Sequence, residues 1–339
     1  MFLGESLKLG DFFHSIPSDI LADIQTMSLK VESERCFESA DEALGKTVLL
    51  GGKRLRPLLT HLFGRFLGLS LEDVRPLARS IEMVHAASLA HDDVIDQAET
   101  RRGVKSINRE ASNKKAILAG DYLLANVIVE LTQTKNLDLV QEMAEVIHQL
   151  AVGEWLQLDA SEDRSYSKDI ILKVARLKTS SVMSWCFVAP ALLKELPDQV
   201  INQARVLGDN LGLAFQFIDD TLDYSKNSDK DQLLDLENNI VNSVVYAWFE
   251  KNPKMYSLFK GGRDLKDLIH TPEHLAELKD CGEMIRLDAH ERLGTCRQTL
   301  DDIAANVEAL NLLNHEGKPL EIKKDGLSFI FDYLEKRMH

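Results

Sequence analysis

Apolar residues recur at intervals of three and four along most of this chain. The spacing is clearest in ILAGDYLLANVIVELTQ, residues 117–133, and in EMAEVIHQLAVGEWLQL, residues 142–158. Such a period is typical of helices that bury one face, whereas strands alternate every second residue. Proline is absent between Pro76 and Pro190, so long helices can run uninterrupted there. We therefore predict an all-α protein whose helices pack in a bundle.

The same period places the individual helices. Ser18 is the expected N-cap of the first helix, with Asp19 in its first turn. No segment shows a convincing hairpin pattern, and residues 253–272 are expected to form a surface excursion. Because no repeat or linker divides the chain, residues 1–339 are expected to form a single domain. Helices are expected at 18–48, 58–69, from 115, 139–158, 169–185, from 241, 273–311 (as one helix or a pair) and 327–337.

Composition limits the kinds of partner. The 339 residues carry a formal net charge of −14, which argues against a general nucleic-acid-binding surface. The four cysteines form no CxxC pair, so neither a zinc site nor a redox pair is indicated. The first residues lack the pattern of a secretory signal, and no apolar run of about 18 residues indicates a transmembrane segment. We expect a soluble protein in the reducing cytoplasm.

An acidic motif lies in HAASLAHDDVIDQAETRRG, residues 85–103. Positions i and i+4 of a helix share a face, so Asp92 and Asp96 are expected on one stripe, with Asp93 beside them. Converging carboxylates raise each other's pKa unless a cation lies between them. Carboxylate oxygens suit Mg²⁺, whose other ligands are commonly phosphate oxygens. Alone, this motif would more often be a solvated acidic turn.

A second copy of the motif changes that balance. The segment FQFIDDTLDY, residues 215–224, repeats the spacing with Asp219, Asp220 and Asp223, again in an apolar helical pattern. Two acidic clusters facing one cavity would form a cage for several metal ions. We therefore interpret all six aspartates as metal-binding.

Basic residues offer candidate sites for anions. Lys53 and Arg56, in GGKRLRP at residues 51–57, are expected at a helix N-terminus, which favours an anion but also suits a solvated cap. Arg101 and Arg102 follow the first acidic motif.

Lys178 lies beside Thr179 in an apolar helical pattern. It either pairs with a charge or extends its amine to the edge of the bundle. Glu154 and Gln157 share a helical face, where they either line a cavity or form ordinary interhelical hydrogen bonds.

Acidic metal-binding groups and separate basic groups together imply two phosphate-bearing substrates. One diphosphate would be held through metal ions and the other by cations alone. The reaction that needs this arrangement is the ionisation of an allylic diphosphate, in which Mg²⁺ acts as a Lewis acid. The double bond of the second substrate then attacks the carbocation, and no nucleophilic Ser, Cys or His is needed.

These segments resemble the trans-isoprenyl diphosphate synthases, also called polyprenyl synthetases. GGKRLRP, HAASLAHDDVID ending in RRG, LKTSS and FQFIDDTLD follow in the family's order over about residues 40–250. The resemblance implies an isoprenoid-synthase type of fold, a single polyprenyl synthetase-like domain of helices around a central cavity, usually in a homodimer. It also implies head-to-tail condensation of isopentenyl diphosphate with an allylic diphosphate, with Mg²⁺ as cofactor, expected as three ions.

The resemblance also assigns a role to each candidate residue. The direct Mg²⁺ ligands would be Asp92, Asp96 and Asp219, with Asp93, Asp220 and Asp223 completing the clusters. Isopentenyl diphosphate would be held by Lys53, Arg56, His85 and Arg102, and the allylic diphosphate by Arg101 and Lys178. Thr179 and Gln216 match residues beside the reacting carbons. The expected catalytic group is therefore Lys178, Thr179, Gln216 and Arg101, with Gln216 also contacting substrate.

One segment departs from the family pattern. After the second acidic motif the family usually has a Gly-Lys pair that closes over the allylic diphosphate. Here Asn238 and Asn239 take the best-aligned positions, and Lys226 or Lys230 would have to reach in from the loop. The departure calls the affinity for the allylic substrate into question, and a slower enzyme or one that closes differently also fits it.

Product length is expected to depend on the fifth and fourth residues before the first motif. In this family the growing chain follows a tunnel beside that helix, and bulk at these positions blocks it. Ala87 and Ser88 occupy them here, and their small side chains predict a product of C20 or longer.

Two other functions fit part of the pattern. A non-catalytic partner subunit that regulates another prenyl synthase would share the fold, but such subunits typically lose aspartates, and both triads are whole here. A class I terpene cyclase would share the first acidic motif but would carry an Asn/Ser/Glu-type second metal site instead of DDTLD.

Overall fold

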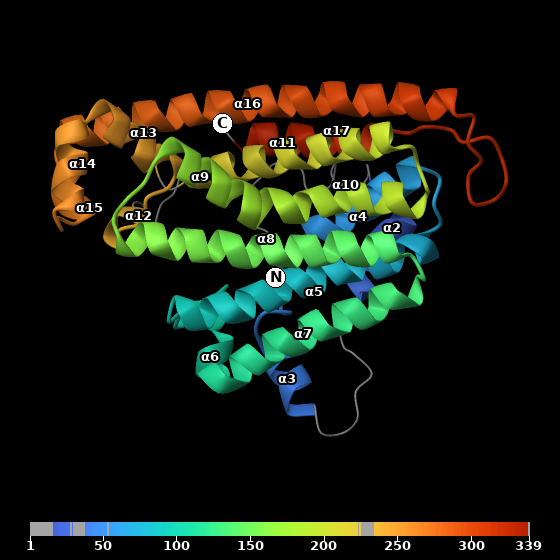
Figure 1. Cartoon of the computed structure of the whole chain (residues 1–339), viewed down its shortest axis with the longest axis horizontal. Coiled ribbons are helices and arrows are strands. Elements are labelled where there is room, and N and C mark those ends of the chain that lie inside the picture. Colours follow the sequence, from blue (N-terminus) through green and yellow to red (C-terminus); the bar gives the residue numbers. More distant parts are fainter. Residues whose placement is uncertain are drawn as a thin grey trace. The chain divides into compact units, whose positions relative to one another are not determined.

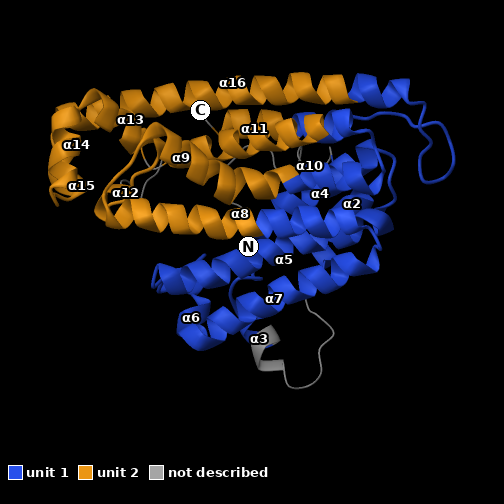
Figure 2. Ribbon diagram, in the orientation of Figure 1, with its two compact units in different colours: residues 1–147, 185–201, 304–329 blue, residues 148–184, 202–303, 330–339 orange. Residues whose placement is uncertain are grey.

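The computed structural model describes residues 16–27, 29, 38–52, 54–222, 224 and 234–337. The chain forms two compact units, shown in different colours in Figure 2. Unit 1 comprises residues 1–147, 185–201 and 304–329, and unit 2 comprises residues 148–184, 202–303 and 330–339. That residues 1–339 act as a single domain stays a prediction.

Unit 1 is built around α5, a helix of 25 residues over Leu71–Ile95 (Figure 1). It packs against α4, Leu55–Phe66, and α7, Asn113–Gln133. A capping box starts α5: the Asp73 amide donates to the Ser70 hydroxyl and the Ser70 amide donates to the Asp73 carboxylate. The shorter helices of this unit are α2 (Ser18–Thr26), α3 (Glu38–Lys46) and α6 (Ile107–Glu110).

Aromatic side chains fill the core of unit 1. Phe63 of α4 stacks on Phe66 and meets Phe187 edge to face, with ring centroids 5.1 Å apart in the second pair. The indole N–H of buried Trp185 donates to the Leu77 carbonyl of α5 at 3.2 Å, which satisfies its one polar atom.

Unit 2 is also helical. Its elements are α9 (Lys168–Ala175), α12 (Leu234–Glu237), α13 (Ser243–Lys251), α14 (Pro253–Lys260) and α15 (Leu265–Leu268). A π-helical turn, Arg176–Ser180, follows α9 directly. Five further helices begin in one unit and end in the other: α8 (Leu137–Glu162), α10 (Ser181–Leu193), α11 (Asp198–Leu222), α16 (Pro272–Ala309) and α17 (Asp325–Lys336).

Helices at nearly all the expected places confirm the all-α prediction. The single helix expected over residues 18–48 is wrong, since α2 ends at Thr26 and α3 begins at Glu38. The expected N-cap is also wrong, because Pro17 takes that position and Ser18 is the first helical residue.

Residues 253–272 do more than form a surface excursion. Their helices α14 and α15 bury Phe259, Leu265, Leu268 and Ile269 in a cluster with Trp248 and Phe249 of α13. The charged residues interspersed along this segment hide its apolar spacing in the sequence.

A short β-hairpin, which the sequence did not predict, follows the first acidic motif. Strand β1 (Thr100–Arg101) pairs with β2 (Val104–Lys105). The two connecting residues, Arg102 and Gly103, have φ angles of 52° and 78°. Two positive φ angles in a two-residue connection are typical of a type I′ turn, where glycine is favoured. Strands of two residues are too short to show alternation.

Among the parts of the chain that the structure describes, α7 is the one helix long and apolar enough to cross a membrane. Only its length and composition support that reading, and the core helix of a water-soluble protein meets the same criteria.

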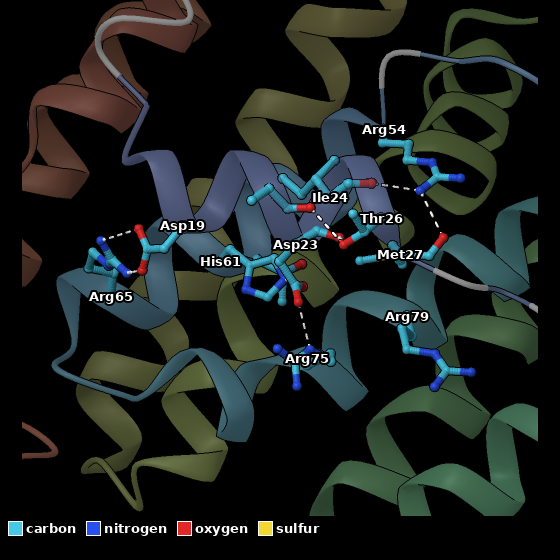
Figure 3. Close-up of polar contacts among 12 residues, drawn as sticks. Asp19, Asp23, Ile24, Thr26, Met27, Arg54, His61, Arg65, Arg75 and Arg79 are labelled. Atoms are coloured by element: carbon cyan, nitrogen blue, oxygen red, sulfur yellow. Dashed lines mark hydrogen bonds and ion pairs between the residues drawn. The ribbon is translucent and has the colours of Figure 1, made fainter.

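Helix α2 is fastened to its neighbours by charged side chains (Figure 3). Asp19 forms an ion pair with Arg65 of α4, and the hydrogen bond from Arg65 lowers the pKa of Asp19. At the other end, a guanidinium nitrogen of Arg54 donates to the carbonyl oxygens of Ile24 and Met27, at 2.6 and 3.0 Å. Arg54 thereby satisfies carbonyl groups that the end of a helix leaves without partners.

A third contact joins α2 to α4 and α5 through the carboxylate of Asp23. Arg75 Nε donates to one oxygen at 2.6 Å, and His61 Nε2 lies 3.1 Å from the other (Figure 3). Burial, together with the positive charges of Arg75 and Arg65, lowers the pKa of His61 to about 4. The negative charge of Asp23 raises this pKa but does not outweigh burial. The His61 ring is therefore neutral at pH 7.

We expect mild acid to destabilise the protein through His61. Its folded pKa of about 4 lies below the ordinary 6.5, so the unfolded chain binds the proton first as the pH falls. The contribution of His61 to stability is complete above pH 6.5 and is lost as the pH falls toward 4, by at most about 3 kcal/mol. Urea unfolding of the wild type and of His61→Gln, at about pH 7.5 and pH 5, measures it.

The His61→Gln variant should lose less stability between the two pH values than the wild type. Burial also depresses the pKa of His85, so the dependence should shrink without vanishing. His148→Gln, at an exposed position of α8, should behave as the wild type. Equal losses in the wild type and His61→Gln would contradict the expectation.

Candidate functional site

The first acidic motif lies at the C-terminal end of α5. Asp92 and Asp93 are in the last turn and Asp96 is the C-cap, whose amide donates to the Asp92 carbonyl at 2.8 Å. The end of a helix carries the negative pole of its dipole, so a carboxylate there costs roughly 0.3–1 kcal/mol. The last turn contains no basic residue. The helix thus concentrates negative charge at a point that favours a cation.

The three aspartates differ in their surroundings. Asp96 is exposed and Asp92 is half-buried, whereas Asp93 is fully buried. One oxygen of Asp93 accepts from Arg101 Nε at 2.7 Å, and the other accepts from the Ile107 amide at 3.3 Å. Asp93 therefore fixes Arg101 and the start of α6.

Basic side chains act on the middle of α5. Burial, together with the charges of Arg56, Arg102 and Arg101, holds the pKa of His85 well below its ordinary value. Burial raises the pKa of Glu82, and the same region's arginines, Arg56 first, oppose it. No sequence motif marks Glu82, although its i, i+3 spacing from His85 puts both on one face.

The segment that precedes α4 contacts Arg102. Gly51 and Gly52 have φ angles of 72° and 85°, which glycine adopts without strain. Arg102 donates to the Leu50 carbonyl at 3.0 Å, which joins the hairpin turn to this segment. Lys53 lies outside the described residues.

The second acidic motif lies at the C-terminal end of α11. Asp219 and Asp220 are in its last turn, and Leu222 ends the helix. This helix also has no basic residue in its last turn. The same unfavourable dipole therefore acts on both motifs. Asp223 lies outside the described residues.

A chain of hydrogen bonds runs through Asp220. The Thr179 hydroxyl donates to Gln216 Oε1 at 2.6 Å, and Gln216 Nε2 donates to Asp220 Oδ1 at 2.8 Å. The amide and hydroxyl of Ser243 both donate to Asp220 Oδ2, at 3.1 and 2.6 Å. Burial raises the pKa of Asp220, and the hydrogen bonds from Ser243 and Gln216 oppose this. Ser243, which no sequence motif marks, thus joins α13 to the motif.

Lys178 is paired with a charge, the first of the two alternatives. Its amine forms an ion pair with Glu154 of α8 and donates to Gln157 Oε1 at 3.2 Å. Lys178 and Thr179 both lie in the π-turn, a rare widening of the helix that occurs frequently at functional sites.

Arg337, directly after the end of α17, is another residue at the second acidic motif that no sequence motif marks. One of its guanidinium nitrogens lies 3.2 Å from Asp219 Oδ1, and the guanidinium carbon is 5.9 Å from the centre of the Phe215 ring. It directly follows α17 and belongs to no local motif.

The Asn238-Asn239 departure has a structural explanation. Asn239 has a φ of 58°, in the left-handed region that asparagine tolerates better than most residues. Its side-chain oxygen accepts from the Leu265 amide at 2.8 Å, at the start of α15. The segment in place of the Gly-Lys pair is therefore tied to α15. Lys226 and Lys230 lie outside the described residues.

The two residues expected to set product length lie on α5. Ala87 is fully buried. Ser88 is half-buried, and its hydroxyl donates to the His85 carbonyl of its own helix at 2.9 Å. Their role beside a growing chain stays a prediction.

The donor set fits hard cations such as Mg²⁺, because carboxylates stand at the negative ends of two helices. Within the described residues no group of three or more His, Cys, Asp or Glu side chains is arranged to hold a metal ion. The motifs lie in different units, with Asp92, Asp93 and Asp96 in unit 1 and Asp219 and Asp220 in unit 2.

We expect Asp93 and Asp96 to respond differently to removal of the charge. Asp93→Asn should lower the free energy of unfolding by about 1–3 kcal/mol, because buried Asp93 accepts from Arg101 and Ile107. Asp96→Asn should leave it unchanged or raise it, because it removes a carboxylate from a helix C-terminus. Chemical denaturation without ligands measures both, and equal effects would contradict the distinction.

Comparison with known proteins covers most of the chain. The polyprenyl synthetase family profile matches residues 38–277. The chain is 38% identical over 215 residues to a decaprenyl-diphosphate synthase of Dictyostelium discoideum, which covers 62% of this chain and 47% of that protein. It is 35% identical over 233 residues to solanesyl-diphosphate synthase 1 of Oryza sativa subsp. japonica, covering 63% and 54%. The chain thus spans about half the length of these relatives.

Longer alignments exist as well. A prenyl transferase of Synechocystis is 32% identical over 300 residues, which covers 85% of this chain and 87% of that protein. The structure of a decaprenyl diphosphate synthase from Rhodobacter capsulatus has a TM-score of 0.75 and 26% identity, covering 98% of this chain and 97% of that one. A geranylgeranyl pyrophosphate synthetase from Geoglobus acetivorans shares the fold, with a TM-score of 0.78, 23% identity, and 96% and 98% coverage. On the match over residues 38–277 and the alignment along most of a relative, the chain belongs to the polyprenyl synthetase family.

Proposed function

We propose that this protein is a Mg²⁺-dependent prenyltransferase. It joins isopentenyl diphosphate head to tail to an allylic diphosphate and makes a trans-polyprenyl diphosphate of C20 or longer. The observation that carries the proposal is the pair of aspartate motifs at the C-terminal ends of α5 and α11, in a member of the polyprenyl synthetase family. The names of the decaprenyl and solanesyl relatives support a long product, as do the small residues Ala87 and Ser88.

The basic residues of unit 1 are the proposed site for isopentenyl diphosphate. Arg56 and Arg102 offer guanidinium groups whose paired donors match phosphate oxygens. His85, kept neutral by burial and by the arginines, offers one ring N–H donor without adding charge. Lys53 is included from the motif alone.

The allylic diphosphate is the proposed partner of Arg101 and Lys178. Asp93 holds Arg101, and Glu154 holds Lys178. Thr179 and Gln216 would stand beside the reacting carbons. Because the Thr179 hydroxyl donates its proton to Gln216, its lone pairs remain available to stabilise a carbocation.

Asp92, Asp96 and Asp219 are the proposed ligands of Mg²⁺. In this structure both carboxylate oxygens of Asp93 and of Asp220 accept hydrogen bonds from protein donors. These two aspartates therefore orient neighbouring side chains of the site instead of binding the metal directly. When bound, Mg²⁺ would supply Lewis-acid neutralisation of the leaving diphosphate. Three ions and a role for Asp223 are proposed from the motifs.

A homodimer is supported by apolar side chains that the chain leaves exposed. On α7, Leu118 is 65% and Val129 57% exposed, and on α8, Trp155 is 71% exposed with Val152 and Leu158 one turn to either side. Exposed apolar side chains gathered on one helix face commonly mark an interface between proteins.

A reducing, cytoplasmic setting is supported by the thiols. Cys186, Cys281 and Cys296 are buried and form no disulfide with one another. Burial raises the pKa of Cys186 and of Cys296 to about 12, so both thiols stay protonated and unreactive at neutral pH.

The activity is tested with purified protein, Mg²⁺, isopentenyl diphosphate and, in parallel, C5, C10 and C15 allylic diphosphates. We expect a ladder of products that ends at one dominant length of C20 or longer, measured by mass spectrometry and abolished by a chelator. Asp92→Asn and Asp219→Asn should each lower turnover by about 100-fold or more, because each removes a charged ligand from the metal that neutralises the leaving group.

Asp138→Asn, an exposed aspartate at the start of α8, is the matched control and should keep full turnover. A wild type that yields no product with any starter would support a partner subunit instead. Cyclic hydrocarbons as products would support a terpene cyclase.

The dimer is tested by sedimentation. Trp155→Glu should give monomers at micromolar concentration, because it places a charge in the proposed interface. Leu287→Glu, a comparably exposed apolar residue on α16 at 69%, should leave the dimer intact. A wild type that sediments as a monomer would refute the proposal.

A further inference from the structure

We propose that Glu154 of α8 is a positioning residue, which fixes the amine of Lys178 where it meets the allylic diphosphate. The inference rests on the proposed function, in which Lys178 contacts that substrate. It assigns a task to a glutamate for which the sequence left only a cavity wall or an ordinary interhelical hydrogen bond.

The Lys178 amine is held from α8 by two groups. It forms an ion pair with Glu154 and donates to Gln157 Oε1 at 3.2 Å. The side chains of Lys178 and Glu154 are 24% and 16% exposed, so solvent screens this pair less than it screens a surface ion pair. An ammonium group has three N–H donors. Two are taken by Glu154 and Gln157, which leaves a third for a diphosphate oxygen.

The backbone around Lys178 is equally constrained. Lys178 lies in the π-turn Arg176–Ser180, which α8 approaches at Gly153 and α11 at Gly212. A Cβ added at Gly153 would lie 2.8 Å from Leu177 Cβ and 2.9 Å from Lys178 Cγ. A Cβ added at Gly212 would lie 2.4 Å from Ser180 Cα. Both glycines permit a close approach that leaves the turn little room to shift.

Fixing the amine has a direct consequence for binding. A lysine side chain is long and flexible, and it loses much rotamer freedom when a ligand immobilises it. When Glu154 and Gln157 already hold the ammonium group, that loss occurs during folding and no longer opposes substrate binding. Glu154 therefore acts on the substrate through Lys178.

The test measures KM for both substrates in a set of variants. Glu154→Ala should raise KM for the allylic diphosphate about tenfold, as loss of a supporting partner commonly does, and leave KM for isopentenyl diphosphate within about twofold. Glu154→Gln should stay close to the wild type, because its amide oxygen can still accept from Lys178. Glu162→Ala, an exposed glutamate at the end of α8, is the matched control.

Two further measurements keep the test independent of one variant's folding. Gly153→Ala keeps both charged groups but forces them apart, so it should also raise KM for the allylic diphosphate selectively. Acetylation of the free protein, followed by mass spectrometry, should show Lys178 reacting faster in Glu154→Ala than in the wild type. Exposed Lys173 of α9 serves as the internal reference.

Lys178→Ala separates this inference from the proposed function. If it raises KM for the allylic diphosphate while Glu154→Ala does not, the positioning role is refuted and the proposed function stands. If Lys178→Ala itself leaves that KM unchanged, Lys178 does not contact the substrate and both assignments fail. Equal increases in both KM values in Glu154→Ala would show a general structural defect and would also refute the positioning role.

Discussion

The site depends on negative charge held where the backbone already disfavours it. Two helices of 25 residues each, α5 and α11, end in aspartates and have no basic residue in their last turns. Each helix dipole points its negative pole at these carboxylates, and the positive side chains that pair with Asp93 and Asp219, Arg101 and Arg337, come from other segments. A fold that only had to be stable would place lysine or arginine there. The acidic ends thus indicate that stability has been given up in favour of binding.

Within each motif the second aspartate accepts hydrogen bonds from other parts of the protein. Asp93 bonds to Arg101 and to the start of α6, and Asp220 bonds to Gln216 and Ser243. Each motif therefore combines an outward carboxylate with an inward one that orients a neighbouring functional side chain. This division explains why a pair of adjacent aspartates opens each motif, since adjacent helix positions point about 100° apart.

Spacing along single helices could be read from the sequence, whereas partners from distant segments could not. The helices of Asp92 and Asp219 follow from apolar periodicity, and the i, i+4 relation of Asp92 to Asp96 follows from helix geometry. Arg337 reaches Asp219 from 118 positions away, and no local pattern marks it. In the sequence, Asn239 is only a departure from the family motif. Its left-handed backbone and the hydrogen bond it accepts from the Leu265 amide of α15 are seen only in the structure.

The π-turn at Arg176–Ser180 also constrains how this segment can change. Its wider ring accommodates one residue more than an α-helix would over the same rise. Deleting one residue between Ala175 and Ser181 would restore an ordinary helix and leave α10 in nearly the same orientation relative to α9, because the π-turn already holds the extra residue. The buried side chains of α10, Trp185 and Phe187 among them, would keep their packing, whereas Lys178 and Thr179 would lose the wide turn that carries them. The extra residue thus serves the turn and not the packing of α10, so a related chain that is one residue shorter here would keep the helix and lack the wide turn.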